Sequence, residues 1–235
     1  MSNRKFPILK ILILVTILAV PGFLYYLLQA KGKNRYKPLP IYGPKEVAAT
    51  FKTKRGKKIP DTIYHQIADV KFLTGNGDSL DLADIKKQLL IVNFFYSRNN
   101  DPAKAMNEQL KSLNSEYETN SMIRFLSISV DPFFDTKDVL KSYAQTIGAK
   151  PNKWDFVVAD TSIVYPLAKK DFFVNVLKPN NNGDDFVFSD QFILLDADHR
   201  IRGYYIGTSR DEVKRLSDEI KVLITEELRK IKAEF

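Results

Sequence analysis

The longest run of apolar positions in the chain lies close to its amino end. No charged residue occurs between Ile11 and Leu28, and a helix over this stretch would cross roughly 30 Å of hydrocarbon. Tyr25 and Tyr26 near its end suit the interfacial belt of a membrane. A cleaved signal peptide has a shorter apolar region, of about 7–15 residues, that ends in small residues. The pattern therefore favours an uncleaved membrane anchor over residues 1–30.

Polar residues dominate the next stretch, residues 31–61, which is rich in lysine, glycine and proline. This composition is typical of an extended linker, so we predict a basic tether here. The lysine-rich run from Lys52 to Lys58 has two interpretations. A solvated linker is the commoner one, and contact with anionic lipid headgroups is the other.

The pattern changes near Thr62, where short apolar segments separated by turn residues begin. Leu89–Tyr96 is apolar at almost every position, which is typical of a central strand covered on both faces. The turn Gly75–Asp78 contains residues that tolerate positive φ and predicts a hairpin. The other strands expected from their apolar residues are 68–74, 80–82, 122–130, 156–158, 191–195 and 201–205.

Helical spacing of apolar residues predicts helices between and after these strands. One begins after Asp135 or Thr136 and stops at Gly148, and another, 161–172, is short or kinked because it contains Pro166. The last helix opens with a capping box, Ser209 and Glu212. The apolar faces include Met106, Leu110, Leu113 and Tyr117 in the first helix, Val139, Leu140, Tyr143 and Ile147 in the second, and Val213, Leu216, Ile220 and Leu223 in the last.

Strands and helices in this order predict an α/β fold, a thioredoxin-like three-layer sandwich over residues 62–235 that follows an N-terminal transmembrane helix. Trp154, Phe156, Phe94 and Phe95 are expected as core aromatics of this domain.

Charge and composition narrow the possible functions. The net charge of +8 comes largely from lysine and arginine before residue 60, beside the apolar run, so we expect membrane lipid and no nucleic acid as a partner. The chain has no cysteine, which excludes disulfides, a thiol nucleophile, thiolate zinc sites and dithiol redox chemistry.

The loop Ser97–Asp101 follows the central strand and precedes a helix. Sites of open α/β sheets are built at such carboxyl ends of strands, but this loop holds neither cysteine nor histidine. Arg98, together with the free amides of the helix start, gives a weak signal for an anion.

Three aspartates offer the oxygen ligands of a cation site if they converge: Asp101, Asp131 and Asp135. Asp101 and Asp135 are better explained as helix caps, and Asp131, which precedes a proline, as part of a turn.

Several separated motifs resemble one known family. They are NFFYSRNNDPAKAM, SVDPFFDTKDVLKSYAQTIGA, Trp154-Asp155-Phe156 and FSDQFILLDADHRIRGYY. In this order, from about Ile63 to Gly207, they resemble the SCO/SenC family. The resemblance implies a membrane-anchored, thioredoxin-fold copper chaperone that serves cytochrome c oxidase assembly.

Members of that family bind copper through two cysteines of a C-x-x-x-C loop and one distal histidine, ligands that suit copper. Aligned on the motifs, the cysteine positions fall on Asn99 and Ala103 and the histidine position on Phe188. Ala103 and Phe188 have no donor atom, and Asn99 offers only a neutral amide. We therefore expect no metal, no cofactor and no catalytic residue in this chain, although copper is expected for the family.

The two histidines of the chain, His65 and His199, do not map to a ligand position. An exposed or locally bonded role is the better interpretation of each, because one imidazole alone makes a poor copper site.

Three functions of different classes follow. The leading one is a non-enzymatic member that keeps the fold and the anchor and binds another protein of respiratory oxidase assembly. The second is a copper chaperone with non-standard ligands, such as His65 or Met106, or with ligands from a partner chain. The third, an enzyme of the thioredoxin superfamily, is least supported because the thiol is missing.

The basic residues on the two sides of the apolar run do not decide its orientation. The family resemblance implies a domain that faces the periplasm or the intermembrane space. The stretch before the span is too short for a mitochondrial presequence, which favours a single-pass protein of a bacterial inner membrane with a periplasmic domain.

Overall fold

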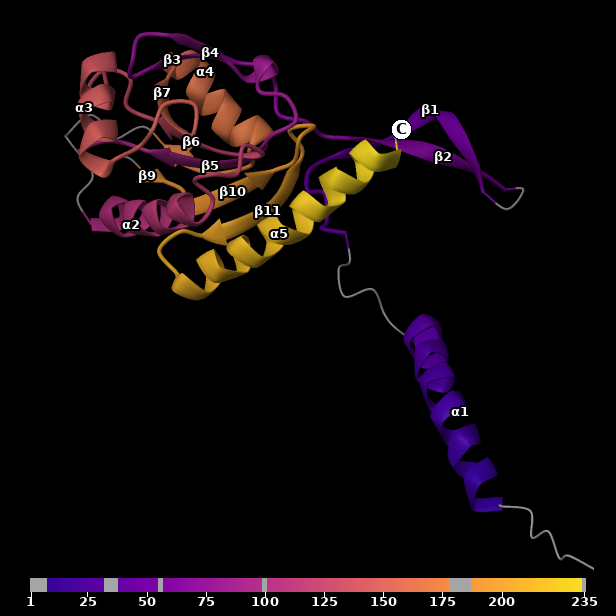
Figure 1. Cartoon of the computed structure of the whole chain (residues 1–235). Coiled ribbons are helices and arrows are strands. Elements are labelled where there is room, and N and C mark those ends of the chain that lie inside the picture. The colour runs from indigo at the N-terminus through magenta and orange to yellow at the C-terminus, as the bar shows by residue number, and fades with distance from the viewer. Residues whose placement is uncertain (1–7, 32–37, 55–56, 99–100, 178–186, 234–235) are drawn as a thin grey trace, which may run out of the picture. The chain divides into compact units, whose positions relative to one another are not determined.

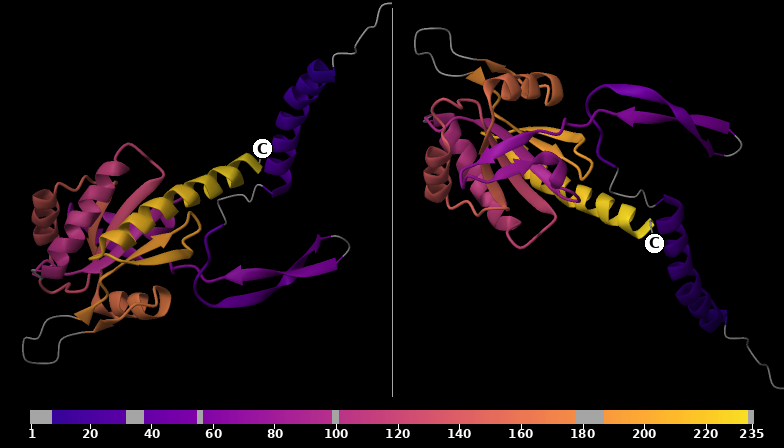
Figure 2. Two further views of the ribbon diagram at one scale, coloured as in Figure 1. Left: turned by 90° about the horizontal axis from the view of Figure 1, so that it is seen from below. Right: turned by 90° about the horizontal axis from the view of Figure 1, so that it is seen from above.

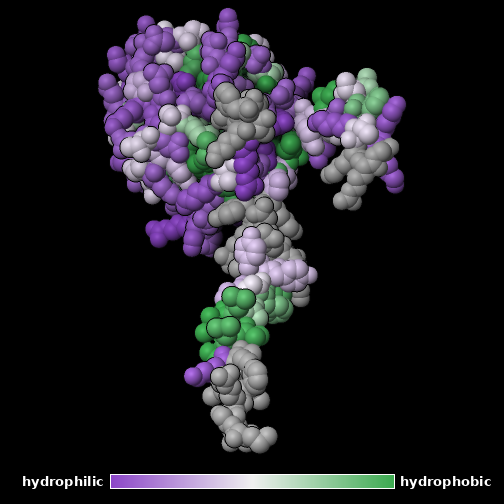
Figure 3. All heavy atoms as spheres, turned by 45° about the vertical axis from the view of Figure 1, so that its right-hand side comes forward, coloured by the Kyte–Doolittle hydropathy of each residue, from purple (hydrophilic) through white to green (hydrophobic). Residues whose placement is uncertain are grey.

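The computed structural model describes residues 8–31, 38–54, 57–98, 101–177 and 187–233, which belong to two units, residues 1–37 and 38–235. The first unit contains helix α1 (Ile8–Lys31), where the apolar run predicts a helix. Apolar side chains of this helix are exposed, and they form the green surface of that segment in Figure 3. No helix in the described ranges combines the length and the apolar content that crossing a membrane requires.

The second unit is built on a mixed sheet of seven strands in the order β11-β10-β5-β6-β7-β3-β4 (Figure 1). At its centre, β5 (Leu89–Phe95), β6 (Ile123–Ser129) and β7 (Trp154–Val158) run parallel. The outer strands pair antiparallel: β10 (Gln191–Leu195) and β11 (Ile201–Ile206) beside β5, and β3 (Lys71–Thr74) and β4 (Ser79–Asp81) beside β7. The carboxyl ends of β5 and β6 therefore meet at one edge.

Helices cover both faces of this sheet, which gives the predicted three layers. One face packs against α2 (Asp101–Glu116), α3 (Lys137–Ile147) and α5 (Arg210–Ala233), and the other against α4 (Thr161–Pro166), the π-helical turn η2 (Leu167–Asp171) and the short helix η1 (Leu82–Asp84). Successive residues of β5 alternate between the two cores, so that Leu89 and Ile91 face the first and Leu90 and Val92 the second. The continuous apolar run of β5 thus belongs to a central strand, as predicted.

The predicted core aromatics are buried. Trp154, Phe156, Phe94 and Phe95 are each at most 3% exposed. The indole N–H of Trp154 donates to the Ser127 hydroxyl at 3.0 Å, and that hydroxyl donates to the Asn93 side-chain oxygen at 2.7 Å. The polar atoms that these central strands bury therefore satisfy one another.

The helix predicted over residues 161–172 is divided, as its proline suggested. Pro166 is the last residue of α4, and the chain continues as η2 to Asp171. A proline cannot donate a backbone hydrogen bond to the preceding turn, which explains the change to a wider helical turn. Two short strands follow, β8 (Val176–Leu177) and β9 (Val187–Phe188), and they pair antiparallel.

The extended tether predicted over residues 31–61 is wrong for its second half. Residues 45–64 form an antiparallel hairpin of β1 (Lys45–Lys54) and β2 (Lys57–Tyr64), which extends away from the sheet in both views of Figure 2. The compact unit begins at Pro38, not at Thr62. The sequence concealed this hairpin because its apolar residues face solvent and are separated by lysines, so no buried face marks it.

Candidate functional site

The candidate site lies at the carboxyl edge of β5 and β6, where the loop after β5 meets the β6–α3 loop. The described part of the first loop consists of Tyr96, Ser97 and Arg98. The second loop begins at Val130 and leads to Thr136, which caps α3. Each of the two loops contributes side chains that bind the other.

Asp135 is the buried centre of this contact, with no exposed surface. Its carboxylate accepts a hydrogen bond from the Ser97 N–H at 3.2 Å, one from the Ser97 hydroxyl, and one from the Ser129 hydroxyl at 2.5 Å. Burial raises the pKa of Asp135 above its ordinary value, the hydrogen bonds from Ser129 and Ser97 oppose this change, and the charge of Asp131 adds to it.

The prediction that Asp135 caps α3 is therefore wrong. The cap is Thr136, whose hydroxyl accepts from the Val139 N–H at 3.5 Å. Both residues were compatible with a cap by sequence, but the hydrogen bonds to two serines on β6 and on the loop after β5 hold Asp135 inside the domain.

Asp131 binds the same loop from the other side. It is 3% exposed and pairs with the Arg98 guanidinium, which lies 4.4 Å above the ring of Phe134. Its carbonyl accepts from the N–H groups of Phe134 and Asp135, which confirms the predicted turn. The carboxylates of Asp131 and Asp135 are thus occupied by an arginine and by serines.

This arrangement does not support the hypothesis of a cation site. The side chain of Asp101 lies outside the described residues. Within the described part of the chain, no three His, Asp or Glu side chains are grouped in a way that could hold a metal ion. Arg98, which carried a weak signal for an anion, is paired with Asp131.

Two neighbouring aromatic residues are exposed on the β6–α3 loop. Phe133 is 77% exposed and Phe134 44% exposed, next to the half-exposed Arg98. In α3, which follows this loop, the ring of Tyr143 stacks on that of Phe95 at 5.5 Å, and its hydroxyl accepts a hydrogen bond from Asn107 of α2 at 2.7 Å. These contacts join α3 to β5 and α2, while the pair Phe133–Phe134 stays exposed on the loop that leads into α3.

Sequence reasoning missed Ser129 and the two phenylalanines as parts of the site, and it included Ser97 only as the first residue of the loop after the central strand. The available signal was the pair of aromatics directly after Asp131-Pro132, in a segment predicted as a turn and therefore exposed. Ser97 and Ser129, which follow or end apolar strands, were a second signal, because a serine in a buried position needs a polar partner.

The structure leaves the three expected ligand positions without described side chains. Asn99 lies outside the described residues, and the side chains of Ala103 in α2 and Phe188 in β9 are likewise not among those described. The backbone of Phe188 pairs with that of Val176.

Both histidines bond to backbone carbonyls of distant segments. The Nε2 atom of His65 lies 2.9 Å from the Asp171 carbonyl oxygen, and that of His199 lies 2.9 Å from the Ile85 carbonyl oxygen. These contacts hold the segment after β2 to η2 and the β10–β11 turn to the end of η1, which is a structural role.

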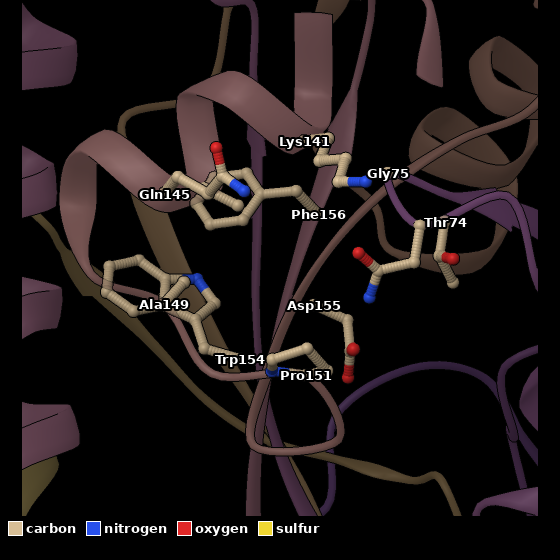
Figure 4. A pocket seen from close by; sticks show the side chains of 11 residues that line it. Thr74, Gly75, Lys141, Gln145, Ala149, Pro151, Trp154, Asp155 and Phe156 are labelled. Atoms are coloured by element: carbon tan, nitrogen blue, oxygen red, sulfur yellow. The ribbon is translucent and has the colours of Figure 1, made fainter. Parts of the chain in front are cut away.

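A separate hollow of about 160 Å³ lies between the β3–β4 turn, α3 and β7 (Figure 4). Its wall includes Thr74, Gln145 and Asp155. The carboxylate of Asp155 is bound by the Arg124 guanidinium at 2.8 Å and by the Asn152 N–H at 3.0 Å. The carboxylate that lines this hollow is therefore engaged in the fold, and the hollow was not predicted from sequence.

Comparison with known proteins agrees with the resemblance seen in the motifs. The family model described as SCO1/SenC matches residues 64–225. The chain is 22% identical over 168 residues to the SCO1 protein homolog of Bacillus subtilis (strain 168), an alignment that covers 71% of this chain and 86% of that protein.

Solved structures share the fold. A SCO1/SenC family lipoprotein from Bacillus anthracis str. Ames has a TM-score of 0.62 at 20% identity and covers 68% of this chain and 95% of its own. BsSco, described as a member of the Sco family of cytochrome c oxidase assembly proteins, has a TM-score of 0.59 at 22% identity and covers 68% of this chain and 93% of its own.

Proposed function

Since the chain belongs to the SCO1/SenC family, a family linked to copper and to cytochrome c oxidase assembly, we propose that it is a non-enzymatic member that acts by binding another protein. In this proposal it carries no copper, because Asn99, Ala103 and Phe188 replace the ligands that the family resemblance implies. The scaffold around the loop after β5, where the family resemblance implies copper ligands, then binds another protein in place of transferring metal.

One observation carries this proposal. The exposed Phe133–Phe134 pair stands beside Arg98, and Asp131 fixes that arginine by an ion pair. Aromatic residues, phenylalanine among them, and arginine are enriched at protein interfaces relative to the rest of the surface. A polar network buried around Asp135 holds this surface at the edge where the family presents its ligands.

The proposed place of action is a bacterial inner membrane, with α1 as a single-pass anchor and the second unit in the periplasm. The uncharged run from Ile11 to Leu28 supports the anchor, and a similar protein from Bacillus anthracis is described as a lipoprotein. We expect the chain to stay with membranes after alkaline washing and to keep its amino end. A mature form that begins after Ala30 would contradict this part of the proposal.

A photocrosslinking amino acid at Phe134, introduced into the full chain in native membranes, tests the binding surface. The matched control is the same amino acid at Phe173, which is 43% exposed against 44% for Phe134 but lies after η2. We expect a discrete protein adduct from position Phe134 and none of that mass from Phe173.

The variant Arg98→Gln should lower the yield of that adduct about tenfold, because the proposal makes Arg98 one of the few interface residues whose truncation costs more than about 1 kcal/mol. Identical adducts from both positions, or none from either, would contradict a binding surface at this edge. Tight stoichiometric binding of copper by the unmodified chain would favour the alternative, a copper chaperone with non-standard or partner-supplied ligands.

A further inference from the structure

The β1–β2 hairpin exposes large apolar side chains on both of its faces. Val47, Phe51, Ile59 and Ile63 are between 49% and 77% exposed. Phe51 pairs with Pro60, and Lys52 pairs with Ile59. Because successive residues of a strand alternate between faces, Phe51 and Ile59 point to opposite sides. A two-stranded hairpin is marginally stable by itself, so such exposure indicates a surface that binds something.

The same hairpin is strongly basic. Between residues 45 and 64 the sequence has six lysines and arginines against two acidic residues. One of the acids, Asp61, is engaged by Lys52 at 3.4 Å and by the Thr50 hydroxyl at 3.0 Å. Lys57 and Lys58 are exposed, and the Lys58 ammonium lies 4.4 Å above the ring of Phe51. Figure 3 shows apolar and polar side chains side by side on this hairpin.

We propose that the β1–β2 hairpin binds the surface of an anionic lipid bilayer, with its lysines at the phosphates and its apolar side chains at the boundary of headgroups and acyl chains. A folded protein partner would cover one face of the hairpin. A bilayer that takes up the free end of the hairpin surrounds both faces, which matches the exposure of Phe51 and Ile59 on opposite sides.

The short length of chain between α1 and the β1–β2 hairpin also supports lipid as the binding partner of the hairpin. The hairpin begins 14 residues after α1, from Lys31 to Lys45, and this length of chain spans at most about 50 Å. This step rests on the proposed anchoring of α1. An anchored α1 would keep the hairpin at a high effective concentration near the lipid headgroups, so weak individual contacts would suffice.

The absence of cysteine allows one label at one site. The full chain with Thr53→Cys, labelled with nitrobenzoxadiazole, is reconstituted into vesicles of phosphatidylcholine or of phosphatidylcholine with phosphatidylglycerol. We expect a blue shift of the emission, and quenching by doxyl-labelled lipid, in the anionic vesicles only. A label at Ser112→Cys, an exposed position of α2, should show neither.

Neutralising three lysines of the hairpin (Lys52→Gln, Lys57→Gln, Lys58→Gln) should abolish the shift. Each lysine near an anionic surface contributes about fivefold to partitioning, so three contribute about a hundredfold. The matched control neutralises three exposed lysines elsewhere (Lys111→Gln, Lys169→Gln, Lys170→Gln) and should keep the shift. The thermal midpoint of each variant reports folding separately.

Flotation of the chain with neutral vesicles reports the anchor, independently of the label. If the emission maximum of the label is the same with anionic vesicles as in water alone, the proposal is overturned, whether or not the chain floats. An equal shift in neutral and anionic vesicles overturns the role of the lysines. Crosslinking of two hairpins through the cysteine introduced by Thr53→Cys, without quenching by lipid, would assign the surface to a second copy of the chain instead.

Discussion

At the scale of single residues, Asp135 shows how the candidate site is held and how it responds to pH. Burial raises the pKa of Asp135 in the folded state above its ordinary value of 3.8. The unfolded chain therefore loses this proton at lower pH than the folded chain does. Burying the ionised carboxylate lowers the free energy of unfolding. This loss is absent below the ordinary pKa, grows as the pH rises toward the pKa of the folded state, and is complete above it.

The variant Asp135→Asn should remove this contribution to the pH dependence of stability, because an amide does not titrate. An amide oxygen can accept from the Ser97 N–H, and the amide N–H₂ can donate to a serine hydroxyl, so the fold is retained. The free energy of unfolding of the unmodified chain minus that of the variant should increase as the pH falls from neutral toward 3.8. Denaturant titrations at several pH values measure it, with Asp138→Asn, at an exposed position, as control. A difference that increases with pH would contradict the assignment.

The copper positions give the second prediction at this scale. The unmodified chain should bind Cu(I) and Cu(II) no better than a surface histidine does, because Asn99, Ala103 and Phe188 supply no thiolate and no imidazole. A triple variant should create a copper site: Asn99→Cys, Ala103→Cys and Phe188→His. Copper binding would be visible as a thiolate-to-copper absorption band and by competition with a chelator. Unmodified protein that competes with the chelator would contradict the proposed loss of copper.

At the scale of elements, much of the fold could be predicted because its strands and helices have complete apolar faces. The run Leu89–Tyr96 and the helices after it are placed as expected. The β1–β2 hairpin could not be predicted, since Val47 and Phe51 are exposed and give no one-sided pattern. Sequence distance hid the partners of Asp135, because Ser97 is 38 residues away and only the folded sheet brings the two loops together.

The packing of the β3–β4 turn against α3 leads to a prediction about two glycines. A Cβ at Gly75 would lie 2.8 Å from the Lys141 nitrogen and 3.0 Å from the Leu140 carbonyl carbon, both of which are backbone atoms. Gly77 has a φ of +89° and open space around it. Gly75→Ala should destabilise the chain by about 1–3 kcal/mol through overpacking.

Gly77→Ala, in the same turn, should cost only about 1 kcal/mol, the price of a positive φ. Denaturant unfolding of the two variants measures both values. If Gly75→Ala costs no more than Gly77→Ala, the close approach of the turn to α3 is not a determinant of stability.

At the scale of the whole molecule, the second unit includes a segment that sequence reasoning assigned to a tether. Arg202 of β11 is 3% exposed and donates to the carbonyls of Leu39 and Pro40 at 2.8 and 3.1 Å. Its guanidinium also pairs with Asp196 and Glu226. One buried arginine therefore joins the segment after Pro38 to the sheet and to α5, which places the start of the folded unit about two dozen residues before Thr62.

A fragment that begins at Thr62 should consequently be less stable than one that begins at Pro38. Without residues 38–61, Arg202 loses two carbonyl acceptors, the Ile201 carbonyl loses the Tyr42 N–H, and the cost should be about 3 kcal/mol or more. Denaturant unfolding of both fragments at one pH measures the difference. Equal stability would restore a boundary at Thr62.

Replacing the β1–β2 hairpin is the control that separates its contribution to stability from that of Leu39 and Pro40. A fragment from Pro38 in which a short glycine-serine linker replaces residues 46–63 keeps Leu39, Pro40 and the bond between the Pro44 carbonyl and the His65 N–H. Because the hairpin is exposed on both faces, this fragment should stay within about 1 kcal/mol of the intact one. If it is instead as weak as the fragment from Thr62, the hairpin contributes to the stability of the fold, and its exposed apolar residues cannot be assigned to a binding surface alone.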